Sequence, residues 1–383
     1  MALPPPPPAP RAASDGTWLD GAPDVRRRRD LLVQGLATGE IRSTSQAALA
    51  TCALLESVAQ AEDWRTASVL LRRIKLVGGS VVRKSPGSLC VANIIRRALL
   101  IVREEYARNL RESTSRRDDA GLQRSLGDVL AAAPRQDPRA RDDRRDVELP
   151  PLREDVLDQL RALGDEVASA RQTVAANAPD LIGVGSVVLT LGRSRGVAAF
   201  LGKAHPREVV VVDEEGQAAA ALQRALPACL ITRVTSATAA AVAGRCTVAV
   251  VGCAAALADG GVIAPPGSRL VAEACAARGK PVLALCALYK LAPLHHPGDT
   301  SARAAVSMHA PPAAALPYSC VPCDPGADPL IHPAPSVRNP RADAVPPDLV
   351  DLLVTNAGVH APSYAPRLLA EMYAPEDHDL LRA

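Results

Sequence analysis

A short turn with two arginines is the first place where this sequence could bind a phosphate. Gly192-Arg193-Ser194-Arg195-Gly196 follows the apolar run 186–191 and precedes a helix-compatible stretch. Backbone amides at such a turn can hold a phosphate, and the guanidinium groups would add positive charge. The turn lacks both the GxGxxG spacing and the Lys-Ser/Thr pair of a P-loop, and 183–185 (Gly-Val-Gly) precedes the strand. An ordinary strand–helix turn is favoured, and phosphate binding stays open as the alternative.

A second candidate is Cys320-Val321-Pro322-Cys323, which has the spacing of redox and metal-binding pairs. It lies in a proline-rich stretch rather than at the start of a helix, so a thioredoxin-type site is not indicated. His309 and His332 flank it at a distance, and no second pair with zinc spacing completes four ligands. Coincidence is the favoured interpretation, and the sequence predicts neither a metal nor another cofactor.

Cys253 follows an apolar run, at a place where α/β proteins often carry their active sites. A catalytic thiolate needs a base or a positive field, whereas the next residues are the alanines 254–256. We expect a buried structural cysteine whose pKa no sequence neighbour lowers. His295-His296 is expected to be an exposed loop pair, and Asp259-Gly260-Gly261 a turn. No catalytic triad order or paired carboxylate set stands out, so the residues alone predict a protein that is not an enzyme.

The overall composition excludes several classes of protein. The 383 residues are 48% hydrophobic and only 2% aromatic, so base-stacking platforms for single-stranded nucleic acid are scarce. A net charge of +3 implies no field that favours nucleic acid or anionic membranes. No apolar run reaches the roughly 18–20 residues that cross a bilayer, and no secretory signal is visible. Nine scattered cysteines suit a reducing compartment, and the expected location is the cytosol.

Helical periodicity dominates the first third of the chain. Residues 1–22 are expected to form a disordered tail and 23–112 a helical domain. Ser43 is expected to cap one helix, and Gly78-Gly79 to end the next. A third helix begins near Leu89, and its outer face is predicted to carry four charged side chains, Arg96, Arg97, Arg103 and Glu104.

The rest of the chain predicts a linker and an α/β domain. Residues 113–150 have too few large apolar residues to offset their ordering entropy and are expected to be a disordered linker. An apolar seam at Val156, Leu160, Leu163, Val167 and Ala170 predicts a helix that joins the two domains. Short apolar runs alternate with helix-compatible stretches over 151–383, which predicts a Rossmann-like domain with a parallel sheet, interrupted by a proline-rich loop over about 294–346. The predicted strands are 186–191, 208–212, 228–234, 247–252 and 281–286.

The C-terminal stretch 345–380 resembles the end shared by the alpha, beta and delta regulatory subunits of translation initiation factor 2B, and is most similar to the beta branch. Segments 63–79, 93–107, 188–201, 250–261 and 280–293 agree in order, whereas 113–150, 211–222 and 300–340 depart from the family. The matching tail residues are Asn356, Gly358, Ala361-Pro362-Ser363-Tyr364, Arg367-Leu368, Glu371, Tyr373, Pro375 and Asp377-His378.

The resemblance implies a non-catalytic regulatory and assembly subunit of the complex that exchanges GDP for GTP on initiation factor 2. It implies a decamer with alpha, gamma, delta and epsilon subunits, contact with the alpha subunit of initiation factor 2, sensing of its phosphorylation, and no direct contact with nucleic acid or membrane. The tail then reads as a subunit interface rather than a catalytic site. Its expected interface residues are Asn356, Gly358, Pro362, Ser363, Tyr364, Asp377 and His378.

Two other functions stay open at the level of sequence. The same superfamily contains sugar-phosphate isomerases that act on phosphorylated ribose derivatives with a Cys after the first strand and an Asp after a later strand end. The matching positions here are Gly192 and Ala254, which cannot transfer protons. A dinucleotide-binding oxidoreductase is the third hypothesis.

Overall fold

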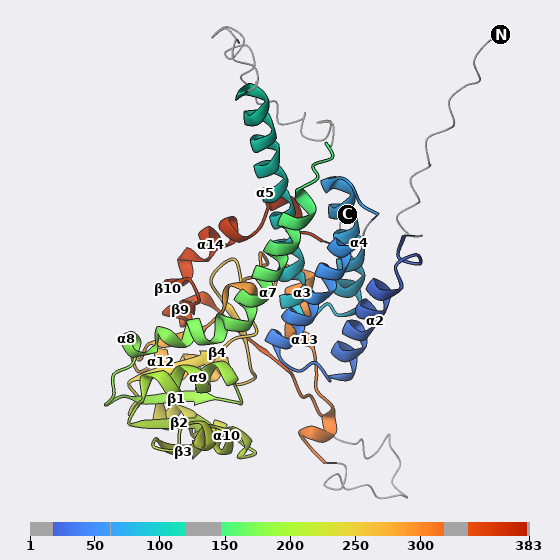
Figure 1. Ribbon diagram of the computed structural model, residues 1–383. Helices are drawn as coiled ribbons and strands as arrows, with labels where there is room; N and C mark the ends of the chain where they lie inside the picture. Colours follow the sequence, from blue (N-terminus) through green and yellow to red (C-terminus); the bar gives the residue numbers. More distant parts are fainter. Residues whose placement is uncertain (1–17, 62, 120–146, 318–335, 381–383) are drawn as a thin grey trace, which may run out of the picture.

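The computed structural model describes residues 18–61, 63–119, 147–317 and 336–380. Within these ranges, a group of packed helices stands beside a layered α/β part (Figure 1). Residues 1–17 of the predicted tail, most of the predicted linker, and Cys320, Cys323 and His332 lie outside the described residues. The helices of the first part are α2 (Pro23–Thr38), α3 (Thr44–Gln60), α4 (Ala67–Lys84), α5 (Leu89–Asp119) and α7 (Leu152–Ala176).

The start of α3 follows the predicted capping. The Ser43 hydroxyl accepts a hydrogen bond from the Gln46 amide (3.2 Å), and the Gln46 side chain accepts one from the Ser43 amide (3.4 Å). This reciprocal capping box satisfies two amides that the first helical turn leaves without partners. Ahead of α2, Trp18 and Leu19 pack against the helical core, and the Arg73 guanidinium lies 4.3 Å from the Trp18 ring centroid. The predicted disorder of 18–22 is therefore not found.

The prediction that Gly78-Gly79 ends a helix is wrong, because α4 continues to Lys84. A Cβ on Gly78 would lie 2.9 Å from the side chain of Ile95 on α5. The glycine therefore allows α4 and α5 to pack closely, and its role is in packing rather than in capping.

Helix α5 differs from its prediction at both its outer face and its length. Arg96 is buried rather than exposed, because its guanidinium bonds to backbone carbonyls of the C-terminal segment. The helix also continues to Asp119, past residue 113 where the sequence predicts a linker. Arg108 pairs with Glu105 (2.6 Å) and with Asp155 of α7 (3.1 Å), which supports α5 near that point.

The five predicted strands are confirmed, and they form the centre of a larger sheet. Its order is β10-β9-β7-β4-β1-β2-β3, parallel except for β10, which pairs antiparallel with β9. The strands are β1 (Val187–Leu191), β2 (Glu208–Val212), β3 (Leu230–Val234), β4 (Val248–Gly252), β7 (Val282–Leu285), β9 (Leu352–Thr355) and β10 (Gly358–His360).

Apolar side chains alternate between the two faces of this sheet, and both faces are covered. Val188, Val209 and Val250 face a core formed with α7, α8 (Ala178–Leu181), α9 (Arg195–Ala204) and α10 (Gln217–Ala225). Leu189 and Val210 face a second core with α11 (Ala239–Ala243), α12 (Ser268–Ala276) and α14 (Ala365–Met372). Burial on both faces explains why the strands are continuous apolar runs.

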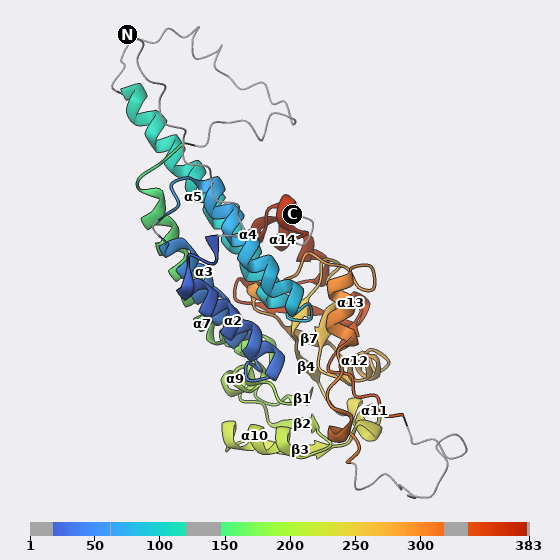
Figure 2. The ribbon, with the colours of Figure 1, turned by 90° about the vertical axis from the view of Figure 1, so that its right-hand side faces the viewer.

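Helix α7 joins the two parts as predicted. Its seam residues Val156, Leu160, Leu163, Val167 and Ala170 are all buried in the core cluster that also holds the interior residues of α3, α4 and α5 and the first face of the sheet. Figures 1 and 2 show α7 running beside α3 down to the sheet. The helical part and the sheet therefore share one continuous core.

The predicted loop at about 294–346 contains regular structure where it is described. It holds α13 (Thr300–Ser307), the short 3-10 turn η3 (Pro312–Ala314) and β8 (Asp343–Val345). β8 pairs antiparallel with β6 (Val262–Ala264), which also pairs with β5 (Ala255–Ala256), and these three make a small second sheet. The Asp343 carboxylate accepts a hydrogen bond from the Gly267 amide (2.7 Å) and thereby ties β8 to the start of α12. Among the described residues, no helix is long and apolar enough to cross a bilayer.

Candidate functional site at the carboxyl edge of the sheet

The two positions that matter for isomerase chemistry lie just beyond neighbouring parallel strands. Gly192 follows β1 and Ala254 follows β4 by two residues, so both lie beyond the carboxyl edge of the sheet. Gly192 has a φ of 64°, a left-handed conformation that favours glycine, and Ala254 is exposed. Neither residue offers an acid, a base or a nucleophile to a substrate at this edge.

The turn after β1 has structural roles that account for its residues. The Ser194 hydroxyl caps α9 by accepting from the Val197 amide (3.2 Å). Arg195 donates to the Ser43 hydroxyl (2.7 Å) and so joins this turn to the start of α3. A Cβ on Gly252 would lie 2.6 Å from the Ser194 hydroxyl, so the turn is held directly against β4. These contacts match the expected strand–helix turn.

Cys253 is buried as predicted, and the side chains that lower its pKa are distant in the sequence rather than its neighbours. Cys286 follows β7, the strand next to β4, and its thiol donates to the Ala287 carbonyl (3.6 Å). The neighbouring Cys286 thiol, which can stabilise the Cys253 thiolate by hydrogen bonding, and the Lys290 ammonium lower the pKa of Cys253 against the opposing effect of burial. The Lys290 ammonium donates to the Cys253 carbonyl (2.8 Å), and the Cys253 thiol donates to the Leu285 carbonyl (3.1 Å). These partners come from other strands and loops, which a local sequence pattern does not reveal.

The 3-10 turn η2 (Leu288–Lys290) connects this edge to several distant elements. Its sequence surroundings, 280–293, are one of the segments that resemble the initiation factor family. Backbone groups in and after the turn bond to the C-terminal part and to α5, in addition to the Lys290 bond just described. These bonds run from Leu288 N to Asn356 Oδ1 (2.8 Å), from Asn93 Nδ2 to Tyr289 O (3.1 Å) and from Tyr373 Oη to Leu291 O (2.8 Å).

Asn356, one of the expected interface residues, therefore has an internal role. Its side-chain oxygen accepts from Leu288, while its amide donates to Glu166 of α7 (3.0 Å). The residue bridges η2 and the helix that joins the two parts. It is half-buried, so part of its surface is still available to a partner.

Gly358, Pro362 and Ser363 lie at the outer sheet edge. Gly358 has a φ of 119° at the start of β10, and Pro362 begins the 3-10 turn η6 (Pro362–Tyr364). The Asp259-Gly260 turn is confirmed, and a Cβ on Gly260 would lie 2.4 Å from the Pro362 carbonyl oxygen. Ser363 lies inside η6, and no side-chain cap precedes α14. The Ser363 hydroxyl belongs to an exposed residue.

Tyr364 is part of a small aromatic patch. Its ring stacks on His360 with centroids 5.0 Å apart and an interplanar angle of 4°. The Arg367 guanidinium lies 5.4 Å from the Tyr364 centroid. We call these three residues the edge patch, because they lie beside β10, the last strand of the sheet. Stacked rings with a guanidinium are chemistry that protein interfaces favour.

Asp377 and His378 lie away from the edge patch, against α4 and α5. Asp377 is 1% exposed, and its carboxylate pairs with Lys75 and Arg103 of its own chain. In this conformation it is not available to another subunit. His378 is half-buried, and its carbonyl accepts from Arg96 (2.9 Å). Sequence reasoning missed Lys75, Arg96 and Arg103, although two arginines seven residues apart on one helix were a usable signal.

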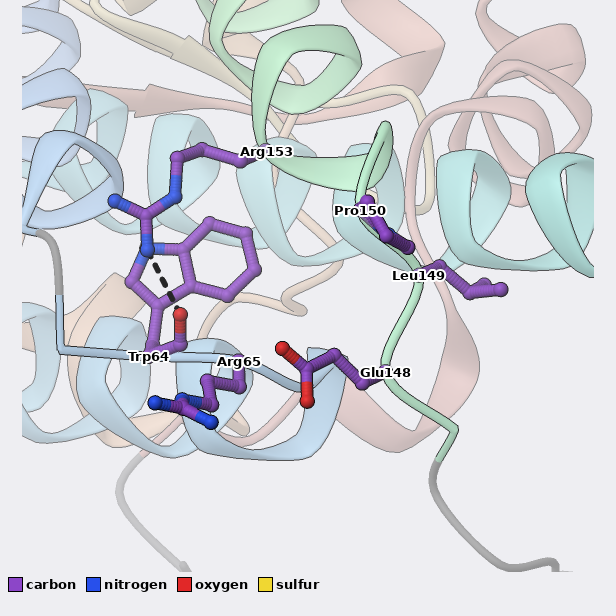
Figure 3. Close-up of a pocket in the computed structure, with 6 residues that line it drawn as sticks. All are labelled: Trp64, Arg65, Glu148, Leu149, Pro150 and Arg153. Atoms are coloured by element: carbon purple, nitrogen blue, oxygen red, sulfur yellow. Dashed lines mark hydrogen bonds between the residues drawn. The ribbon is translucent and has the colours of Figure 1, made fainter.

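A separate polar pocket of about 390 Å³ lies between the α3–α4 connection and the start of α7. Figure 3 shows the Arg153 guanidinium above the Trp64 indole, 4.9 Å from its centroid, with a hydrogen bond to the Trp64 carbonyl (2.8 Å). Glu148 lines the pocket opposite Arg65. With a carboxylate facing the exposed guanidinium, the pocket has no clear preference for an anion. Its contacts explain instead how Trp64 anchors α7.

Metal binding finds no support in the part of the chain that the structure describes. No group of three or more His, Cys, Asp or Glu side chains there could hold an ion.

The prediction that His295 and His296 are both exposed is confirmed for one of them. His295 is exposed and lies 3.8 Å from Asp299, while His296 is half-buried.

Comparison with known proteins finds relatives of this chain among translation initiation factors. A profile of the Initiation factor 2 subunit family matches residues 40–362. The chain is 29% identical to translation initiation factor eIF2B subunit beta of Dictyostelium discoideum over 371 residues, which cover 87% of this chain and 91% of that protein. The structure of eIF2B beta from Chaetomium thermophilum superposes with a TM-score of 0.68 at 24% identity, covering 95% and 98% of the two chains. A chain of the tetrameric eIF2B-beta2-delta2 complex from C. thermophilum gives 0.65 at 24% identity, with 94% and 100% covered.

Proposed function

The chain belongs to the initiation factor 2 subunit family, and on that premise we propose that it is a beta-type, non-catalytic regulatory and assembly subunit of the guanine-nucleotide exchange factor for initiation factor 2. The observation that carries the proposal is similarity to a beta subunit over nearly the full length of both chains. The carboxyl edge of the sheet adds chemical support, because Gly192 and Ala254 supply no proton-transfer group there.

The alternative function, isomerisation of a phosphorylated ribose derivative, has less support. Cys253 is the one thiol close to Ala254 in sequence, and it is buried with its thiol directed at the Leu285 carbonyl. The Lys290 ammonium is likewise occupied by the Cys253 carbonyl. Turnover of 5-carbon aldose 1-phosphates by the purified chain would overturn the regulatory proposal in favour of this one.

For partners, we propose a delta-type subunit first, since a related beta chain is found with delta in a tetramer. Beyond that, the resemblance supports a decamer with alpha, gamma and epsilon subunits in the cytosol, which binds initiation factor 2 chiefly through its alpha subunit. Phosphorylation of that partner would add roughly −1.5 to −2 charges, and a coupling free energy of about 1–3 kcal/mol would suffice to change the exchange rate.

We propose that the exposed side of the tail takes part in subunit contact. The proposed surface consists of the edge patch with Ser363, the accessible sides of Asn356, Gly358 and Pro362, and His378. Asp377 supports it from inside the chain. The edge patch offers two stacked rings and a guanidinium that is 69% exposed in its side chain, so an acidic or aromatic surface on the partner would complement it.

The test is co-purification of the tagged chain from its own cells, followed by mass measurement of the complex. Recovery of delta- and epsilon-type subunits in near-equal amounts is the expected result, and recovery as a lone homodimer would contradict the proposal. Tyr364→Ala is expected to weaken recovery of the delta-type subunit at least about tenfold if the edge patch is central to the interface. Arg224→Ala, on the exposed side of α10, is the matched control and is expected to change recovery little.

A further inference from the structure

The last described segment of the chain joins two separate hydrophobic cores. Residues 373–380 leave α14, form the 3-10 turn η7 (Pro375–Asp377) and lie against α4 and α5 (Figures 1 and 2). Tyr373 belongs to the core on the second face of the sheet, whereas Leu380 belongs to the core shared with the helices. Eight residues thus connect the far face of the sheet to the helical part.

One buried carboxylate holds the middle of this segment. The Asp377 side chain has no exposed surface, and it pairs with Lys75 of α4 (3.2 Å) and with Arg103 of α5. Taking a carboxylate out of water is costly, and two cations at this distance offset that cost. Removing the carboxylate leaves both cations without this partner, whereas removing one cation leaves the other beside Asp377, so the arrangement is most sensitive to substitution of Asp377.

Arg96 holds the backbone of the same segment. Its guanidinium donates to the Asp377 carbonyl (3.2 Å), to the His378 carbonyl (2.9 Å) and to the Asn93 side chain (3.0 Å). Asn93 in turn donates to the Tyr289 carbonyl in η2 (3.1 Å). A single guanidinium therefore connects the C-terminal segment, through α5, to the carboxyl edge of the sheet.

We propose that residues 373–380 form a latch that fixes the helical part against the sheet, with Asp377 as the residue that closes it. The three cations bind only the three consecutive residues 376–378, so the latch opens as one unit. Apart from the short turn η7, the segment has no helix or strand of its own, so its opening costs less than global unfolding. While it is closed, α4 cannot move away from the sheet without separating a buried ion pair. This inference concerns the isolated chain and is independent of the proposed partners.

The test is amide hydrogen exchange of the full chain, comparing wild type with Asp377→Asn. Exchange is expected to become at least about tenfold faster in peptides from 374–380 and from the C-terminal half of α4. Peptides from β1, β2 and α9 are expected to keep wild-type rates, because the ion pairs of Asp377 are made with α4 and α5 and not with these elements.

Glu376→Gln is the matched control. Glu376 neighbours Asp377 and pairs with Arg103 (3.2 Å), but its side chain is 57% exposed. Exposed pairs contribute little, so exchange is expected to change less than about threefold.

Arg103→Gln is the second variant and keeps the test decisive if Asp377→Asn does not fold. It leaves Lys75 beside Asp377, so a smaller acceleration is expected in the same peptides. For either variant, wild-type rates in 374–380 would overturn the proposal. Equally faster exchange in the sheet peptides would also overturn it, because that result indicates general destabilisation. Faster exchange in 374–380 with unchanged exchange in α4 would overturn it as well, because the segment would then not hold α4 in place.

Discussion

Gly78 lies where α4 and α5 touch, and the absence of a side chain allows the two helices to lie this close together. A Cβ there would be 2.9 Å from Ile95, which is itself fully enclosed. Gly164 in α7 is the opposite case, since a Cβ there would meet nothing within 4 Å. The same residue type inside two helices therefore has opposite consequences for stability.

Substituting these two glycines by alanine should separate packing from helix propensity. Gly78→Ala is expected to lower the free energy of unfolding by about 1–3 kcal/mol, because overpacking outweighs the gain in propensity. Gly164→Ala is expected to raise it by about 0.5–1 kcal/mol. Chemical denaturation of both variants measures the difference, and stabilisation by Gly78→Ala would show that the helices are not held at this separation.

His378 gives the latch a pH dependence. Burial, and then the Arg96 guanidinium, lower the pKa of His378 below its ordinary value of 6.5, while Asp377 and Glu376 oppose the shift more weakly. The unfolded chain therefore takes up this proton at a higher pH than the folded chain. The resulting loss of stability is absent well above pH 6.5 and grows as the pH falls below it.

His378→Gln is expected to reduce the fall in the free energy of unfolding between pH 7 and pH 5. His295→Gln serves as the control, since that side chain is 66% exposed and outside the latch. Denaturation curves at a series of pH values measure both slopes. An unchanged slope in His378→Gln would mean that the histidine is equally easy to protonate in the folded and unfolded chains.

Two turns fix each other's position by close backbone contact: the turn between β5 and β6, and the turn η6. Gly260 has a φ of 88° and approaches the Pro362 carbonyl so closely that a Cβ would lie 2.4 Å from its oxygen. The Asp259 carboxylate accepts from the Gly261 amide (2.9 Å) and fixes this turn. The small sheet thereby sets the position of the segment that carries the edge patch.

Alanine substitution at two glycines of similar conformation should isolate this contact. Gly279 has a φ of 61° but open space around its Cα, so Gly279→Ala is expected to cost about 1 kcal/mol from backbone strain alone. Gly260→Ala is expected to lower the free energy of unfolding by at least about 2 kcal/mol more, because the backbone of the β5–β6 turn or the backbone of η6 must move. Equal losses in thermal or chemical unfolding would indicate that η6 yields freely.

For the whole molecule, the shared core predicts unfolding in one transition. The two tryptophans of the chain, Trp18 and Trp64, both lie in the helical part, so their fluorescence reports on that part alone. Far-UV circular dichroism reports on the helices of both parts. Because α7 buries its seam against both, the two signals are expected to share one midpoint.

Leu160→Ala tests this coupling directly. Leu160 is 2% exposed in the α7 seam, so its truncation is expected to cost about 2–5 kcal/mol and to shift both midpoints equally. Leu31→Ala, at a side chain that is 57% exposed, is expected to change stability by no more than about 0.5 kcal/mol. A fluorescence midpoint that moved alone would indicate two independently folding domains.

The sequence alone predicts the elements whose signals are local. The strand runs, the α7 seam, the Ser43 cap and the Asp259-Gly260 turn depend on spacing within a few residues, and these predictions hold. It also determined which chemistry is missing, because the side chains at positions 192 and 254 can be read directly. The resemblance of the tail selected the family, which the comparisons support.

Residues whose partners are distant in the chain have roles that become visible only in the folded protein. Arg96 reads as an outer-face charge in sequence, yet it binds a carbonyl 281 positions away. Lys290 and Cys286 lie near Cys253 because β4 and β7 are adjacent in the sheet. Position 78 requires a glycine because the side chain of Ile95 on α5 packs against it. Periodicity records which face of an element is apolar, but it does not record which element will cover that face. Which element covers a face decides whether a charge on it is buried and whether a position on it must be glycine.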